Sequence, residues 1–215
     1  VRPGDTMYSI AFRYGMDYRR LGAANGLGPP YTIYPGQRIA LREASLASTR
    51  SATARKAAPA STSGKSRSTA AKAGSGKSPS VSASPAPASS GSQVEPRWRW
   101  PTQGAVVRGY SSSVHKGIDI GGSRGDPVHA VAAGRVVYAG TGIVGFGELL
   151  IIKHNDVYLS AYGHNGRLLV EEGDAVKAGQ RIALKGSSGT DKVKLHFEIR
   201  RRGQPVDPAK HLPAR

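Results

Sequence analysis

The sequence predicts two small folded units joined by a flexible linker, the first a βααβ unit and the second a mainly antiparallel β-sheet unit. Residues 1–42 contain short apolar periods typical of helices. Residues 43–96 have very few large apolar side chains. Residues 97–215 contain short alternating runs separated by Gly-rich turns, and 215 residues suffice for two such domains.

The first unit is expected to follow the order strand, helix, helix, strand. Asp5 or Thr6 caps a first helix, whose apolar positions recur at helical spacing. A second helix is predicted over residues 17–25, and a closing strand over residues 34–41. We expect the opening strand to be cut short at Val1.

Three sequence motifs occur in the order Pro-Gly-Asp-Thr, Ala-Asn-Gly-Leu and Pro-Gly-Gln-Arg-Ile. Together they resemble a LysM module over residues 1–42. LysM modules bind glycans that contain N-acetylglucosamine, such as peptidoglycan. By that resemblance, the glycan groove is lined by Gly4, Asp5, Thr6, Met7, Gly28, Pro29, Pro30 and Ile33. In the alternative interpretation, Asp5 and Thr6 only cap a helix and Met7 only fills the core.

The linker, residues 43–96, is rich in Ser, Ala, Pro and Gly. It carries seven basic residues and no acidic residue between Ala44 and Val94. Too few apolar side chains are present to offset the entropy of ordering it. As a random coil it would span on the order of 40 Å.

The formal net charge of +17 raises the possibility of nucleic-acid binding. However, seven of the positive charges lie in the linker, and the chain has no recognition-helix pattern, aromatic-rich strand set or zinc finger. We therefore expect no specific nucleic-acid partner, because attraction to anionic wall polymers or a membrane surface explains the charge. The absence of cysteine excludes disulfides and thiolate metal sites.

No stretch of membrane-spanning length and no signal-peptide pattern occur in the sequence. We expect an export signal upstream of Val1, together with any lipid-anchoring cysteine. The full-length protein is then expected to be a periplasmic lipoprotein anchored in the outer membrane.

The second unit is predicted to begin near Trp98 and Trp100, whose rings are expected to pack at its edge. No helix of convincing period follows. Short strands are predicted at residues 106–108, 127–131, 135–139, 149–154, 156–162 and 181–184. These runs favour a mainly antiparallel sheet that forms a groove.

The last strand, residues 193–200, alternates between apolar and polar side chains and places His196 on its polar face. His115 and Asp119 share parity, so in an extended run both project from the same side. His164 ends another alternating run on the polar parity. Two histidines and a carboxylate form a ligand set that suits zinc, with His164 beside an open position.

These residues also resemble a known family. His-x-x-x-Asp, then Tyr-x-His, then x-x-His-Phe-Glu-Ile-Arg, is similar to the LytM or M23 zinc peptidases, which cut peptide crosslinks in bacterial cell walls. The similarity extends over residues 104–208. It implies that His115, Asp119 and His196 are zinc ligands and that His164 is one of two histidines that orient the attacking water.

The second water-orienting histidine is expected two residues before His196, where this chain has Lys194. An ammonium group offers donors only and cannot accept a proton from water. The chain therefore resembles the NlpD-like murein hydrolase activators, which keep the groove and bind a partner amidase without cutting. The groove expected from this resemblance consists of His115, Asp119, His164, Lys194, His196 and Phe146.

The activator resemblance implies a role in cell division, in which the chain activates an N-acetylmuramoyl-L-alanine amidase during daughter-cell separation. A zinc-dependent peptidoglycan endopeptidase is the alternative. Zinc binding is left open, because Lys194 would either repel the metal or itself pair with Asp119.

Overall fold

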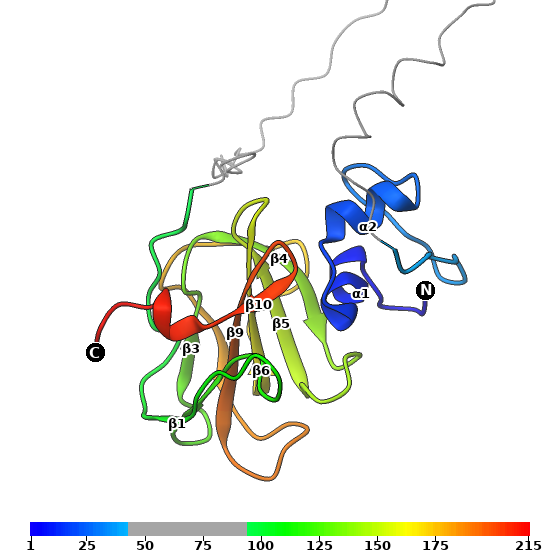
Figure 1. The fold of residues 1–215 in the computed structure, drawn as a ribbon. Coiled ribbons are helices and arrows are strands. Elements are labelled where there is room, and N and C mark those ends of the chain that lie inside the picture. The colour runs from blue at the N-terminus through cyan, green and yellow to red at the C-terminus, as the bar shows by residue number, and fades with distance from the viewer. Residues whose placement is uncertain (43–93) are drawn as a thin grey trace, which may run out of the picture.

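The computed structural model describes residues 1–42 and 94–215, which form two folded units (Figure 1). The predicted linker spans residues 43–96, so nearly all of it lies outside the described residues.

The first unit contains both predicted helices, α1 (Met7–Tyr14) and α2 (Tyr18–Ala24). Thr6 is the N-cap of α1, where its side chain accepts a hydrogen bond from the Ser9 amide and the Ser9 side chain bonds back. Asp17 caps α2 by accepting from the amides of the second helix's first turn. Thr6, one of the two residues predicted to cap the first helix, therefore sets the start of α1, and Asp17 sets the start of α2.

The structure corrects both predicted strands of the first unit, because neither residues 1–6 nor residues 34–41 form a regular strand. The Gly36 amide donates to the Val1 carbonyl at 2.9 Å, and the Val1 amino group donates to the Gln37 carbonyl at 2.9 Å. At the other end of residues 34–41, the Ala40 amide donates to Asn25 Oδ1 at 2.7 Å, so the segment is held by separate contacts with Val1 and with a side chain. A strand needs a partner along its length, and this segment has none among the described residues.

The second unit is an antiparallel β structure, as predicted, and every strand pair in it is antiparallel. The main path of strands runs β1-β2-β9-β6-β5-β4-β7, with β3, β8 and β10 paired beside it. The strands are β1 (Val106–Arg108), β2 (Ile118–Gly121), β3 (Pro127–His129), β4 (Gly134–Gly140), β5 (Glu148–Lys153), β6 (Tyr158–Leu168), β7 (Ala175–Val176), β8 (Arg181–Lys185), β9 (Lys194–Arg201) and β10 (Gln204–Val206). A short 3₁₀ helix, Pro208–Lys210, follows.

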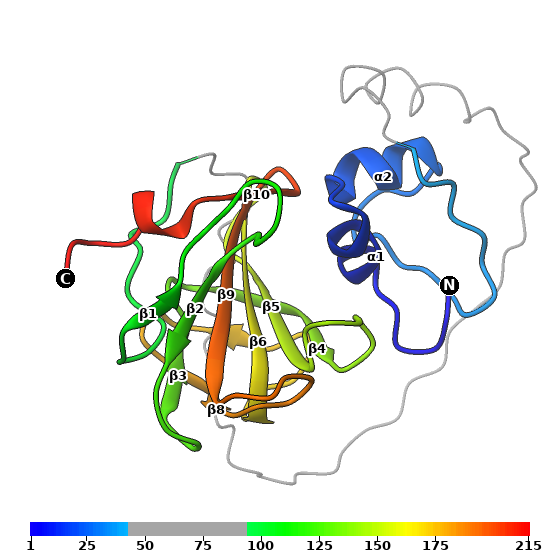
Figure 2. The same ribbon diagram turned by 60° about the horizontal axis from the view of Figure 1, so that its bottom comes forward.

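Strand β9 lies between β2 and β6, and the three run side by side (Figure 2). The register pairs Asp119 with His196 across β2 and β9, and Gly163 with His196 across β6 and β9. Two segments far apart in the sequence therefore meet at His196.

The apolar face of β9 is buried in the main core of the second unit, where Leu195, Phe197 and Ile199 are fully covered. Trp98 joins this core at its edge and is 8% exposed, as expected for a packing residue. Trp100 lies partly buried against the same core.

A second apolar cluster lies on the β4-β5-β6 part of the sheet, and it includes a residue of the first unit. Phe12 of α1 is 3% exposed and packs there with Tyr138, Leu149 and Ile151. The first unit also docks on the β-sheet unit through a polar contact, in which the Thr6 hydroxyl donates to the Val137 carbonyl at 3.2 Å. The first unit therefore covers one face of the sheet instead of standing apart from it.

Docking also requires close backbone approach at the turn between β9 and β10. Gly203 has a φ of 82°, and a side chain there would overlap the backbone of Met16 in the first unit. Beside it, the Gln204 side chain donates to the Gly15 carbonyl at 2.6 Å.

Replacing Phe12 with alanine should separate the two units, because burial of this ring contributes about 3–5 kcal/mol in a packed environment. The radius of gyration measured by small-angle X-ray scattering is expected to rise. Tyr14→Ala is the matched control, since Tyr14 lies on the same helix and is 53% exposed. An unchanged radius of gyration in Phe12→Ala would contradict docking through this ring.

His154, which the sequence leaves without a site role, is buried in the second unit. Its Nδ1 lies 2.8 Å from the Ala133 carbonyl oxygen and its Nε2 2.7 Å from the Ser160 hydroxyl. Burial lowers the pKa of His154 to about 4. The folded state therefore holds this histidine neutral where the unfolded chain would protonate it.

The unfolding free energy of the second unit should fall as pH drops from about 6.5 to about 4, because in that window the unfolded state binds more protons. The contribution of His154 is about 3 kcal/mol. Both tryptophans lie in this unit, so urea unfolding followed by tryptophan fluorescence reports it. His154→Gln should show a shallower pH dependence; equal slopes in the two proteins would argue against this assignment.

Candidate metal centre and partner groove

The centre is built around Asp119 on β2, opposite His196 on β9. His115 reaches it from the loop before β2, which is held by backbone hydrogen bonds in both directions between Ser111 and His115. Gly117 lets this loop pass close to β9, because a side chain there would overlap the Phe197 carbonyl. The loop thus directs His115 toward the strand pair.

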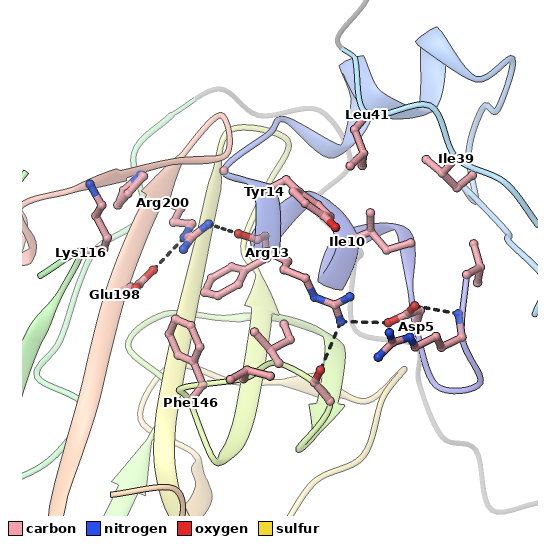
Figure 3. A pocket seen from close by; sticks show the side chains of 18 of the residues that line it. Asp5, Ile10, Arg13, Tyr14, Ile39, Leu41, Lys116, Phe146, Glu198 and Arg200 are labelled. Carbon is pink, nitrogen blue, oxygen red and sulfur yellow. Dashed lines mark hydrogen bonds and ion pairs between the residues drawn. The ribbon is translucent and has the colours of Figure 1, made fainter. Parts of the chain in front are cut away.

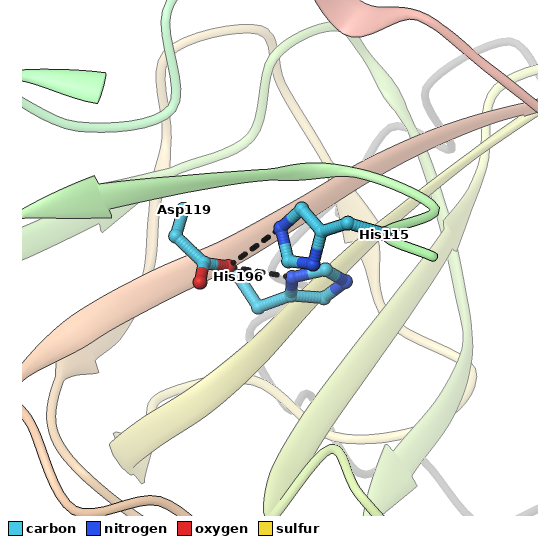
Figure 4. Close-up of side chains that lie close together, drawn as sticks. All are labelled: His115, Asp119 and His196. Carbon is cyan, nitrogen blue, oxygen red and sulfur yellow. Dashed lines mark hydrogen bonds and ion pairs between the residues drawn. The ribbon is translucent and has the colours of Figure 1, made fainter. Parts of the chain in front are cut away.

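The three predicted ligands come together in the structure (Figure 4). The Oδ1 atom of Asp119 lies 3.2 Å from His115 Nε2 and 2.8 Å from His196 Nδ1. One ligand atom from each residue lies within 4.8 Å of the others. His115 Nε2 is buried and makes no hydrogen bond to the described residues. An unsatisfied buried ring nitrogen beside a carboxylate and a second histidine is a donor set that fits zinc.

Lys194 occupies the other side of the same carboxylate. Its Nζ lies 2.8 Å from Asp119 Oδ2. Lys194 and His196 are two residues apart on β9, so both project from the polar face. Of the two possibilities that the sequence left open for Lys194, the structure contains the ion pair with Asp119.

These contacts determine the charges at the centre. Burial alone would raise the pKa of Asp119, but hydrogen bonds from His196 and Lys194 outweigh it and hold the pKa well below its usual range. Burial would lower the pKa of His196, yet the carboxylates of Asp119 and Glu198 raise it. The pKa of His115 is lowered, chiefly by burial. Asp119 is therefore an anion that is stabilised by hydrogen bonds from His196 and Lys194.

Behind His196 lies a row of two further polar side chains of β9, Glu198 and Arg200. The sequence pattern did not predict their contacts. Glu198 Oε1 is 3.2 Å from His196 Nε2, and Glu198 Oε2 accepts from Arg200 Nε at 2.8 Å. A carboxylate on the second nitrogen orients a metal-binding imidazole. Glu198 therefore pairs with Arg200, which has the same parity on β9.

Arg200 links this row to the first unit, a role that sequence reasoning missed. Its Nη1 donates to the Phe12 carbonyl at 2.6 Å, and its guanidinium lies 3.4 Å from the centre of the Phe12 ring. The only available signal was its parity with His196 and Glu198 on β9. A continuous set of contacts therefore joins the centre to α1.

His164 lies beside the centre, with its ring centre 6.0 Å from that of His196. Its Nδ1 is 2.8 Å from the Ser188 carbonyl, which only accepts hydrogen bonds, so Nδ1 carries the proton and Nε2 the lone pair. Burial lowers the pKa of His164, which favours the neutral ring. His164 thus keeps the form needed to accept a proton, and Lys194 does not.

Phe146 closes the groove toward the first unit. Its ring centre lies 5.5 Å from His196 and 5.3 Å from Phe12, edge-on to both. Beyond it a cleft of about 1340 Å³ opens between the two units (Figure 3). Lys116, Glu198 and Arg200 also line this cleft. Of the six residues predicted to form the partner groove, Phe146 lines this cleft and the other five do not.

The predicted glycan residues divide into two groups. Six line one cavity that the first unit shares with the β-sheet unit: Asp5, Thr6, Met7, Pro29, Pro30 and Ile33. Gly4 and Gly28 are not among its lining residues. Thr6 caps α1, and Met7 is 1% exposed and packs in the core. Both structural roles are thus present, and glycan contact stays a prediction.

Comparison with known proteins gives a separate match for each of the two folded units. Residues 1–42 match the LysM domain model, and residues 113–208 match the model of peptidase family M23. The "Lipoprotein NlpD/LppB homolog" of Pseudomonas aeruginosa is 56% identical over 229 residues, covering 100% of this chain and 76% of that protein. The chain belongs to the NlpD/LppB family. The family match confirms the resemblance predicted from the motifs.

Other relatives agree with this family assignment. The "Murein hydrolase activator NlpD" of Salmonella dublin is 40% identical and covers 100% of this chain and 68% of its own length. The "Outer membrane antigenic lipoprotein B" of Haemophilus influenzae is also 40% identical, covering 99% of this chain and 63% of its own length. In residues 1–42 and 94–215, no helix is long and apolar enough to span a bilayer.

Among solved structures, a zinc-containing peptidase from Vibrio cholerae is similar to this NlpD/LppB-family chain. The TM-score is 0.50 at 31% identity, with 53% of this chain and 39% of that chain covered. The similarity places the β-sheet unit in a peptidase scaffold.

Lys194→Ala should bind zinc at least roughly tenfold more tightly than the unmodified chain, because it removes a cation that competes for Asp119. Competition with a chromophoric chelator measures the affinity directly. Lys192→Ala is the matched control, since Lys192 is exposed two residues away. Equal affinities in all three proteins would mean that Lys194 does not compete with metal.

Proposed function

We propose that this chain is a non-catalytic activator of a periplasmic N-acetylmuramoyl-L-alanine amidase. Residues 1–42 bind peptidoglycan, and the groove at the metal centre binds the amidase during daughter-cell separation. Relatives named murein hydrolase activators and the match to the LysM domain model support this function.

The ion pair between Lys194 and Asp119, at 2.8 Å, is the observation that carries the proposal. Hydrolysis of a peptide requires a group that accepts a proton from the attacking water. Lys194 is a cation that offers donors only, and it stands where the peptidase pattern has a histidine. His164 is then the single retained base.

In this proposal the groove binds a partner although Lys194 stands in place of the second water-orienting histidine. Phe146 is a half-buried aromatic ring that lines the adjoining cleft together with charged residues, and aromatic residues often anchor protein interfaces. The adjoining cleft gives a partner access along one side of the groove. An amidase segment with apolar and acidic side chains would match Phe146 and Lys116.

The same proposal places the full-length protein in the cell envelope. Relatives from Pseudomonas aeruginosa and Haemophilus influenzae are named lipoproteins, and the second is named an outer-membrane antigen. An acylated residue upstream of Val1 would anchor the protein while residues 1–42 contact the wall.

A zinc endopeptidase is the second candidate, and the convergence of His115, Asp119 and His196 favours it. These three residues would hold the metal, which when bound would polarise a scissile carbonyl and acidify a water. His164 Nε2 would accept a proton in that reaction. The Lys194 ammonium group would remain beside Asp119 and weaken this chemistry.

Release of dye from labelled peptidoglycan sacculi separates the two candidates. We expect no release by this chain alone, and a faster release when it is added to an amidase. Phe146→Ala should lower this stimulation by roughly tenfold, because it removes the aromatic anchor of the groove.

Val144→Ala is the matched control in the same loop, since Val144 is 97% exposed. No stimulation of any tested amidase by the unmodified chain would count against the activator function. Release by the chain alone that a chelator abolishes would support the endopeptidase instead.

A further inference from the structure

A cavity of about 670 Å³ lies between the first unit and the β-sheet unit. One wall contains six of the eight residues that the LysM resemblance assigns to the glycan groove. The opposite wall belongs to the second unit and comes from β4, the end of β5, the turn after β5 and the loop before β7. The volume lies within the range of about 300–1,000 Å³ typical of small-ligand sites.

The two walls are held together by direct contacts. The Thr6 hydroxyl, at the cavity's edge, donates to the Val137 carbonyl at 3.2 Å. The Tyr18 hydroxyl of α2 donates to Asp156 Oδ1 at 3.4 Å, and Lys153 Nζ lies 2.9 Å from the same oxygen. Asp156 therefore connects the two units, so the cavity is part of the docked structure.

The chemistry of the walls is complementary to an amino sugar. Such a sugar has apolar C–H faces, hydroxyl groups that donate and accept, and an acetamide group. The first wall offers the Tyr31 ring and two prolines, which are surfaces for an apolar face. The second wall adds the donors Arg135 and Lys153 and the acceptor Glu172.

Charge in the cavity is balanced. Arg19, Arg135 and Lys153 are matched by Asp5, Asp156 and Glu172, and all six line it. A balanced lining favours a neutral polar ligand over a polyanion. An uncharged N-acetylglucosamine oligosaccharide therefore fits better than a nucleic acid.

We propose that this cavity is one composite site for an amino-sugar oligosaccharide, in which Arg135 and Glu172 of the β-sheet unit contact the glycan held by the first unit. The inference rests on the glycan binding proposed above and adds the second unit as a glycan-contacting surface. Bound glycan then bridges both units and favours their docked arrangement beside the partner groove.

Isothermal titration of the full chain with chitotetraose, a neutral β-1,4-linked N-acetylglucosamine tetramer, tests the composite site. Arg135→Ala combined with Glu172→Gln should weaken binding at least fivefold. Both residues are exposed, so the fold should persist, and circular dichroism checks this. Arg181→Ala is the control, since Arg181 is exposed on β8 and does not line the cavity.

The outcomes distinguish the inference from the proposed function. Weakened binding by the double variant, with the control unchanged, supports the composite site. Equal or tighter binding by the double variant overturns it while leaving glycan binding by the first unit in place. Absence of binding by the unmodified chain overturns both.

Discussion

The buried carboxylate of Asp119 is the constraint on which the rest of the site depends. A carboxylate removed from water must be paired, because an unpaired buried charge is very costly. Here it lies within 3.2 Å of nitrogen atoms of His115, His196 and Lys194. The pairing of β2 with β9 makes this possible by placing Asp119 opposite His196. The ion pair with Lys194 thus helps to satisfy this buried anion.

The requirement that buried charged groups be paired also explains how the two units are joined. The polar face of β9 would ordinarily face water, yet Glu198 is 1% and Arg200 6% exposed. Each is satisfied by its neighbour in the row, and the last contact is the Phe12 carbonyl of α1. Docking of the first unit therefore covers the polar row and completes its hydrogen bonding.

This arrangement relates the wall-binding unit to the groove. Phe12 contacts Arg200 on one side and Phe146 on the other, and Phe146 contacts His196. In this peptidase-like scaffold, Lys194 forms an ion pair with Asp119. The docked first unit therefore places the LysM module beside the metal centre.

Several features of this protein followed from the sequence by itself because they depend on local order. The capping pair Asp5 and Thr6 marked the start of the first helix, and period-two alternation marked β9. Ordered motifs singled out His115, Asp119 and His196, which the structure brings close together. Extended propensity alone did not make a strand of residues 34–41, because strand formation needs a partner. Tertiary structure alone decided the ion pair of Lys194 and Asp119, the choice of Arg200 by Glu198 and the docking of Phe12. These depend on distances between residues far apart in the chain, which periodicity and motif spacing do not encode.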